Sequence, residues 1–221
     1  MISAIAGFAA GSIHVLAGPD HLAAISPLAV ESKKSTWIIG LRWGIGHTTG
    51  VGLVGLLALI GREIIPIDII SSYSERLVGL VLITIGIWGI HKALSKKIHT
   101  HHHMHDGTEH VHVHTHLTIG GDPEKEHRHT HAALVVGIIH GFAGSSHFLG
   151  ILPALALPTR ADAIIYLAAF GAGTICAMMA FSSLMGMLAV RLAQRGIQFY
   201  HRLLIGFSSL SIIIGSVWLF I

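Results

Sequence analysis

Two histidines and an aspartate stand close together near the start of the chain, in a stretch that is otherwise almost wholly apolar. They are His14, Asp20 and His21. On a regular helix His14 and His21, seven residues apart, lie within about 20° of the same face. A carboxylate beside imidazoles in an apolar segment is costly to bury and is usually functional. The segment therefore predicts a cation site, against the alternative of a polar cluster that only packs helices together.

The sequence also predicts a break between these two histidines. Pro19 lacks an N–H, and its ring clashes with the carbonyl of Val15 in a continuous helix. The preceding Gly18 makes a break easier still, because glycine tolerates most backbone conformations. We expect carbonyl oxygens freed by the break to face the same site.

A related pattern recurs 126 residues later. That offset superposes His14 on His140, His21 on His147, Gly18 on Gly144, Pro27 on Pro153, Thr48 on Thr174 and Arg76 on Arg202. A Gly/Ala/Leu-rich composition would explain matched glycines but not two matched histidine pairs. Asp20 becomes Ser146 in the second copy, so negative charge is concentrated in the first. We expect His140 and His147 to line the path of the ion, with interhelical hydrogen bonding as the alternative.

A third imidazole follows in the run Trp43-Gly-Ile-Gly-His47, whose glycines would let a neighbouring helix approach closely. Imidazoles with one carboxylate suit nickel, cobalt or zinc, whereas magnesium and calcium prefer oxygen ligands. The sequence thus predicts one set of intramembrane metal ligands, namely His14, Asp20, His21, His47, His140 and His147. The residue types leave Ni²⁺, Co²⁺, Zn²⁺ and Mn²⁺ open as the cargo, and no resident cofactor is expected. Since metal binds deprotonated imidazoles, loading should compete with protons.

These residues are embedded in apolar runs long enough to cross a bilayer. Hydrophobic residues make up 52% of the 221 residues and charged residues only 11%, which excludes a soluble enzyme, a nucleic-acid binder and a disordered regulator. The single cysteine, Cys176, excludes a disulfide framework. Spans are expected at 2–30, 36–61, 76–95, 132–157, 161–190 and 198–220. They should be helices, because backbone polar groups in lipid must bond within their own segment.

Six spans and an internal repeat predict an all-α integral membrane protein built from two inverted three-helix repeats. We expect the repeats at 1–95 and 132–221, with a His-rich loop at 96–131 between them. Lysines and arginines in the loops and near the ends of the spans, with Arg42 left out, favour one side by ten to three. This bias places the loop in the cytoplasm and both termini outside a cell inner membrane. The first span lacks a basic start and is expected to be retained rather than cleaved.

The expected loop holds twelve of the nineteen histidines and predicts a secondary metal site. They are His99, His101, His102, His103, His105, His110, His112, His114, His116, His127, His129 and His131. Alternation puts His110 to His116 on one face of a strand. A hairpin with the alternating stretch 127–131, turning at 120–123 and pinned by metal, is one prediction; a disordered chain that binds metal weakly is the favoured alternative. Either form would buffer or sense metal.

The runs His14-Val-Leu-Ala-Gly-Pro-Asp-His21, Gly-Ile-Gly-His47 and Leu152-Pro-Ala-Leu-Ala-Leu-Pro-Thr-Arg160 resemble the nickel/cobalt transporter superfamily. The likeness is to its urease-accessory-type (UreH-like) membrane proteins and their plastid relatives, and it covers all six expected spans. The resemblance implies a secondary transporter of Ni²⁺, Co²⁺ or a similar ion rather than an enzyme. The first run matches the family's His–Asp–His signature, and His47 matches its glycine–histidine motif. The better-known permeases have four residues between the first His of the signature and its Asp-His, whereas this chain has five. Those permeases also have eight spans, whereas six are expected here.

Two rival functions remain open beside transport of a metal ion across the lipid bilayer. A membrane-tethered metal store or metallochaperone would use the loop to supply nickel to a metalloenzyme, with nickel-enzyme maturation proteins as partners. A di-iron membrane enzyme would use histidines four apart, such as His99 and His103, although dense His-X-His repeats produce that spacing by chance.

Overall fold

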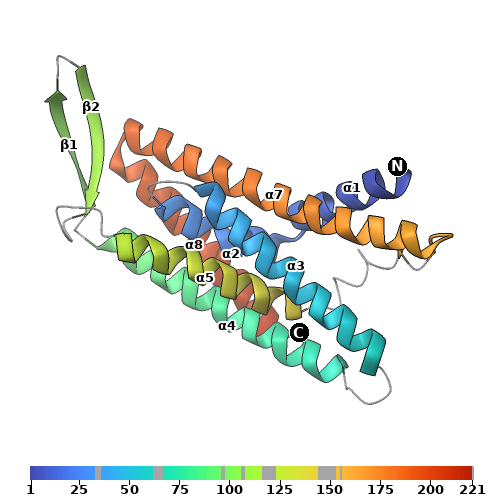
Figure 1. The fold of residues 1–221 in the computed structure, drawn as a ribbon. Coiled ribbons are helices and arrows are strands. Elements are labelled where there is room, and N and C mark those ends of the chain that lie inside the picture. The colour runs from blue at the N-terminus through green and yellow to red at the C-terminus, as the bar shows by residue number, and fades with distance from the viewer. Residues whose placement is uncertain are drawn as a thin grey trace.

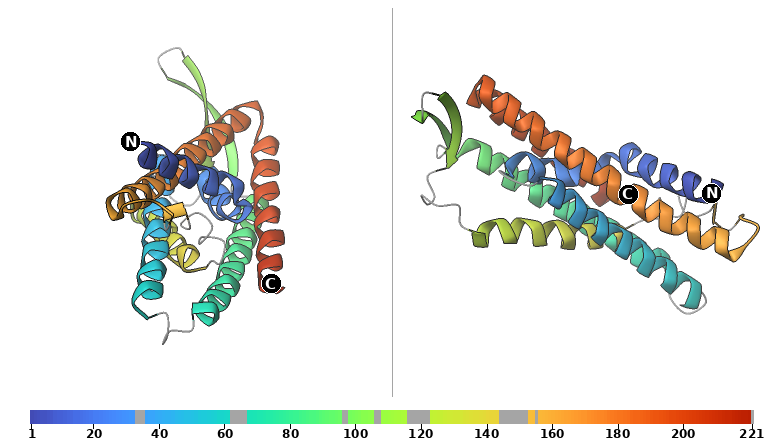
Figure 2. Two further views of the ribbon diagram at one scale, coloured as in Figure 1. Left: turned by 90° about the vertical axis from the view of Figure 1, so that its right-hand side faces the viewer. Right: turned by 45° about the horizontal axis from the view of Figure 1, so that its top comes forward.

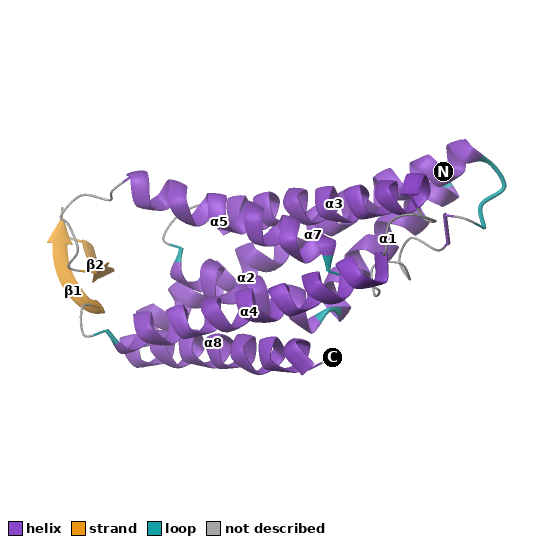
Figure 3. Cartoon of the chain, turned by 90° about the horizontal axis from the view of Figure 1, so that it is seen from below, coloured by secondary structure: helices purple, strands orange, loops and turns teal. Residues whose placement is uncertain are grey.

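The computed structural model describes residues 1–32, 36–61, 67–95, 98–105, 108–115, 123–143, 153–154 and 156–220. Within these ranges the chain forms seven helices and one hairpin (Figure 1). They are α1 (Ile2–Ala17), α2 (Pro19–Glu31), α3 (Thr36–Gly61), α4 (Ile67–Leu94), β1 (Ile98–His105), β2 (Thr108–Thr115), α5 (Pro123–Phe142), α7 (Arg160–Arg195) and α8 (Ile197–Phe220). The helices form an elongated bundle, with the hairpin at one end and the N-terminus towards the other (Figure 3).

The first apolar run is two helices rather than one. α1 ends at Ala17, α2 begins at Pro19, and the two helices are bent by 73°. Pro19 stands in the first turn of α2, where a missing N–H is tolerated. The N–H of Gly18 donates to the carbonyls of His14 and Val15 at 3.1 and 3.2 Å, which closes the end of α1. The break predicted at Gly18-Pro19 is confirmed.

Many large apolar side chains face the outside of the bundle, and several polar side chains are buried inside it. Large apolar side chains are exposed on the outer faces of the helices, among them Ile5, Ile13, Leu80, Ile87, Ile164, Leu184 and Ile213. Polar side chains are buried between helices, among them Asp20, His21, Ser26, His47, His140, Thr174, Ser182, Ser208 and Ser211. Some bond from helix to helix: Ser211 Oγ donates to the Ala23 carbonyl at 2.7 Å. An apolar exterior with polar groups bonded inside suits a lipid environment.

Three of the described helices are long and apolar enough to cross a membrane: Ser72–Leu94 within α4, all of α7 and all of α8. The bent pair α1–α2 makes a fourth if it is taken as one span. These correspond to four of the six expected spans. α3 occupies the expected range 36–61. α5 begins before the expected 132–157 and ends at Phe142. The chain is therefore an α-helical, multi-pass membrane protein.

Close backbone contacts hold the helices in pairs. α1 packs along α7, α3 along α5 and α4 along α8 (Figure 2). A Cβ added at Gly11 would meet the Phe170 carbonyl oxygen, and one at Gly141 would meet the His47 carbonyl oxygen. Without side chains at these points, the helix backbones can approach. Because α3 also packs on α7, these contacts fix the relative positions of α1, α3 and α5.

The His-rich segment is arranged differently from the predicted hairpin. β1 pairs with β2 in an antiparallel register that places His99 opposite His114, His101 opposite His112 and His103 opposite His110. The stretch 127–131, predicted as a strand, belongs to α5, so the predicted pairing of 110–116 with 127–131 is wrong. Two physical reasons account for this: strands closest in sequence close with the smallest loss of chain entropy, and Pro123 is well suited to begin a helix.

Candidate metal centre

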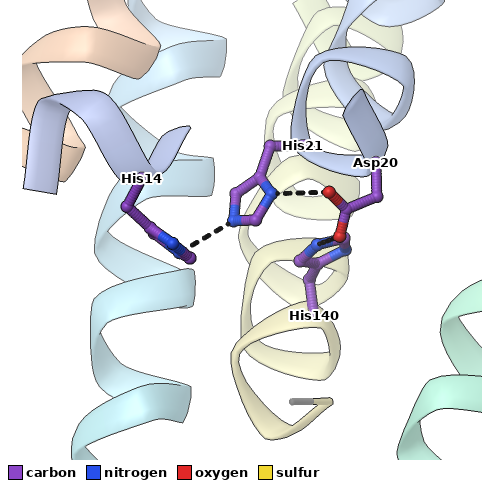
Figure 4. A network of polar contacts seen from close by, with 4 residues as sticks. All are labelled: His14, Asp20, His21 and His140. Atoms are coloured by element: carbon purple, nitrogen blue, oxygen red, sulfur yellow. Dashed lines mark hydrogen bonds and ion pairs between the residues drawn. The ribbon is translucent and has the colours of Figure 1, made fainter. Parts of the chain in front are cut away.

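His14 and His21 face each other across the break between α1 and α2 (Figure 4). His14 lies in the last turn of α1 and His21 in the first turn of α2, and their Nε2 atoms are 3.2 Å apart. On an unbroken helix the two residues would be separated by about 10 Å along the axis. The bend therefore brings two imidazoles that are distant along a helix into direct contact.

Asp20 ties the start of α2 to α5. Its side chain is buried, with Oδ1 at 3.0 Å from Nδ1 of His21 and Oδ2 at 2.9 Å from Nε2 of His140. An ionised carboxylate only accepts hydrogen bonds, so both ring nitrogens donate to it. A neutral His21 that is protonated on Nδ1 keeps its lone pair on Nε2, the atom that faces His14. The carboxylate thus sets the tautomer of a histidine that could bind metal.

His47 reaches the same place from α3. Its ring centroid lies 4.9 Å from that of His21 and 5.7 Å from that of His14. The three histidines each offer one ring nitrogen, and these atoms lie within 4.8 Å of one another. An ion about 2 Å from each nitrogen would hold them roughly 3–4 Å apart. Small rotations of the rings would therefore let them share one ion.

A second set of donors overlaps the first. Asp20, His21 and His140 are all buried, and their donor atoms also lie within 4.8 Å of one another. The structure therefore brings together five of the six predicted intramembrane residues, which we call the His/Asp centre: His14, Asp20, His21, His47 and His140. The sixth, His147, lies outside the described residues.

The histidines of the predicted secondary site fall into three groups. Eight of them lie on β1 and β2, at the end of the bundle (Figure 1). His127, His129 and His131 belong to α5, and His131 is exposed. His116 lies outside the described residues.

Trp43, to which sequence reasoning assigned no role, forms a wall of the His/Asp centre. It is fully buried, its ring stacks on His47 with centroids 4.8 Å apart and planes at 10°, and it lies 5.4 Å from the rings of both His21 and His140. Trp43 precedes His47 by four residues, so the two share a face of α3. That spacing was the signal that could have found it. A large apolar ring here excludes water, which strengthens electrostatic interactions within the centre.

Gly18 leaves room for the hydrogen bond between His21 and Asp20. A Cβ at this position would meet Nδ1 of His21 and would lie 3.0 Å from Oδ1 of Asp20. We expect Gly18→Ala to disturb that bond and to lower Ni²⁺ affinity about 10- to 100-fold, as is typical when an outer-shell partner is lost. Calorimetric titration of the purified protein measures this.

The titration requires a loop-silent background, in which the twelve histidines from His99 to His131 are replaced by glutamine. Gly52→Ala is the matched control, since a Cβ at Gly52 would have nothing within 4 Å. Equal Ni²⁺ affinities for the two variants would contradict the prediction.

Comparison with known proteins places the chain in a family. Residues 4–216 match the family described as the cytochrome c biogenesis protein transmembrane region. The chain is 32% identical over 183 residues to the urease accessory protein UreH of Bacillus sp. (strain TB-90), which covers 81% of this chain and 74% of UreH. It is 32% identical over 192 residues to the chloroplast protein FOR GROWTH AND FERTILITY 1 of Arabidopsis thaliana, which covers 84% of this chain and 50% of that protein.

A third relative, from Methanocaldococcus jannaschii, carries the name of a nickel/cobalt efflux system and is 28% identical over 109 residues, 48% of this chain and 49% of its own length. The chain spans about half the length of the chloroplast relatives it matches. No solved structure matches it significantly. UreH and the relative from M. jannaschii bear the names of an accessory protein and of an efflux system. The chain therefore belongs to the family of the cytochrome c biogenesis protein transmembrane region and, through UreH, to the UreH-like membrane proteins.

Proposed function

We propose that the protein transports a divalent transition-metal ion, Ni²⁺ or Co²⁺, through the His/Asp centre. The observation that carries this proposal is the gathering of four imidazoles and the buried carboxylate of Asp20 into two overlapping donor sets, inside a bundle whose outer surface is apolar. Ionisable groups in the interior of a membrane protein mark ion pathways. Imidazole nitrogens with one carboxylate favour borderline ions such as Ni²⁺, Co²⁺ and Zn²⁺. The name of the relative from M. jannaschii favours the first two.

The broken span supplies favourable electrostatics for a cation. His14 stands at the C-terminal end of α1, where the helix dipole is negative. Asp20 stands in the first turn of α2 and offsets the positive end of that dipole. An arriving ion would exchange part of its water for ring nitrogens while the Asp20 carboxylate holds His21 in a binding tautomer.

We further propose that the chain consists of two inverted repeats that rock about the ion. The 126-residue offset maps α1 onto the range of α5 and α3 onto the range of α7. The first helix of one repeat therefore packs along the second helix range of the other: α1 packs along α7, and α5 packs along α3. Equivalent helices thus carry His14 and His140 to one centre, as alternating access between repeats requires. His147, the counterpart of His21, is proposed to line the same path.

The proposed orientation follows from the lysine and arginine bias. The hairpin lies at the opposite end of the bundle from the N-terminus (Figure 3). We place the hairpin in the cytoplasm and the termini outside an inner membrane, with the ion and the lipid bilayer as the partners of the chain.

Metal flux into proteoliposomes tests the function. Wild-type protein should carry Ni²⁺ and Co²⁺ faster than Mn²⁺, and His14→Ala should abolish the flux by removing one donor. His91→Ala is the control, since His91 is an exposed histidine of α4 outside the centre. Equal flux through wild type and His14→Ala would refute transport through this centre.

A second candidate, a membrane-tethered metal store that supplies nickel to a metalloenzyme, is favoured by the paired histidines of β1 and β2 and by the accessory role in the name of UreH. We expect the loop-silent background to bind fewer ions per chain, as metal analysis would show, yet to keep its flux. Deletion of 99–131 would be a poorer test, because α5 begins at Pro123. Loss of all bound metal in the loop-silent background, together with an absence of flux in wild type, would favour the store.

A further inference from the structure

His21 belongs to both donor sets of the His/Asp centre, and each of its ring nitrogens faces one of them. Nε2 lies 3.2 Å from Nε2 of His14, in the set that His47 completes. Nδ1 lies 3.0 Å from Oδ1 of Asp20, in the set that His140 completes. The two sets therefore lie on opposite edges of one imidazole ring. We call them the triad position (His14, His21, His47) and the carboxylate position (Asp20, His21, His140).

We propose that the two positions are filled one at a time and that His21 passes the ion from one to the other. This inference rests on the proposed function and adds an order of events to it. The triad position uses donors from α1, α2 and α3, all in the first half of the chain. The carboxylate position adds His140 from α5, in the second half. A step between them would carry the ion from donors of one half to donors shared by both.

The chemistry of imidazole makes the positions mutually exclusive. A neutral ring has one lone pair, so it ligates one ion at a time. An ion at the triad position uses Nε2 of His21 and leaves the Nδ1 proton bonded to Asp20. An ion at the carboxylate position uses Nδ1, and the proton of His21 then resides on Nε2, where His14 accepts it. His140 likewise moves its proton from Nε2 to Nδ1, so that both rings exchange tautomers and no proton is gained or lost. Two divalent ions this close would also repel strongly.

Trp43 supports the step because it borders both positions. Its ring stacks on His47 of the triad position and lies 5.4 Å from the ring of His140 of the carboxylate position. The rings of His21 and His140 are themselves 4.6 Å apart. The ion would therefore move along a wall that offers no competing ligand, from one edge of His21 to the other.

Cobalt binding tests the proposal, since the visible spectrum of bound Co²⁺ reports its ligands. Full-length protein in the loop-silent background is titrated with Co²⁺, the bound metal is counted, and Co²⁺ flux is measured in proteoliposomes. Wild-type His/Asp centre should bind one Co²⁺. His47→Gln and His140→Gln should each still bind one ion, with different spectra, at affinities lowered about 10- to 100-fold. Both should lose flux, because each removes one station of the path.

His21→Gln should lose binding and flux together, and His91→Gln, outside the centre, should change neither. Two ions bound to the wild-type centre would overturn exclusive filling. If only one of the variants His47→Gln and His140→Gln loses binding, and the other keeps normal flux, the ion uses a single position. That result would overturn the transfer between two positions. In both cases the proposed function would stand, provided that wild type carries Co²⁺. Wild-type protein without Co²⁺ flux would instead refute the proposed function itself.

Discussion

Asp20→Asn should lower the Ni²⁺ affinity of the His/Asp centre about 10- to 100-fold and reduce metal flux accordingly. The substitution keeps the size of the side chain but removes the charge that partly offsets that of the bound ion. It also changes the hydrogen bonds. The carboxylate accepts from Nδ1 of His21 and from Nε2 of His140, whereas an amide offers one acceptor and one donor group.

The mismatch has a specific consequence for His21. If the amide N–H faces Nδ1, that nitrogen must accept, and the ring proton moves to Nε2, which faces His14. The lone pair needed for the ion is then absent. If the amide is turned the other way, its N–H faces Nε2 of His140, whose proton moves to Nδ1, and His21 keeps the tautomer that binds at Nε2. The first orientation therefore removes a ligand as well as the charge.

Calorimetry in the loop-silent background and Ni²⁺ flux measure the effect. Asp162→Asn is the matched control: it removes a half-buried carboxylate at the start of α7 that accepts from Ser3 Oγ at 2.8 Å. Its affinity and flux should equal those of wild type. Wild-type affinity in Asp20→Asn would remove the carboxylate from the mechanism.

Gly141→Ala should destabilise the protein by about 1–3 kcal/mol and abolish flux. A Cβ at this position would meet the carbonyl oxygen of His47, and it would lie 2.8 Å from the N of Val51 and 2.9 Å from the Cα of Gly50. All three neighbours are backbone atoms, which cannot rotate away. α5 must therefore move away from α3. This movement separates His140, on α5, from the metal donors on α2 and α3.

Thermal unfolding in detergent and Ni²⁺ flux provide the two measurements. Gly52→Ala, in α3, is the control, because a Cβ there would have open space around it. It should be neutral or slightly stabilising, since alanine favours a helix more than glycine does. If Gly141→Ala unfolds at the wild-type temperature and keeps its flux, the close approach of α3 and α5 is not required for the centre.

The sequence by itself determined the features that depend on local chemistry. Composition determined a helical membrane protein, because lipid leaves few other ways to satisfy the backbone. Gly18-Pro19 determined a break, because the clash of the proline ring with the preceding turn is local. The residue types of His14, Asp20 and His21 indicated divalent metal before any neighbour was known.

Only the tertiary structure decided which partners meet. It placed His140 against Asp20, 120 residues away, and gave Trp43 a place between three histidines. It also replaced the predicted pairing of the stretch 127–131 with that of β1 and β2. The spacing of residues along the chain determines which of them share a face of a helix. Which two helices come close depends on how their glycines and side chains pack against each other. That packing is a property of the folded bundle, and it is what divides one set of predicted ligands into two sets that share His21.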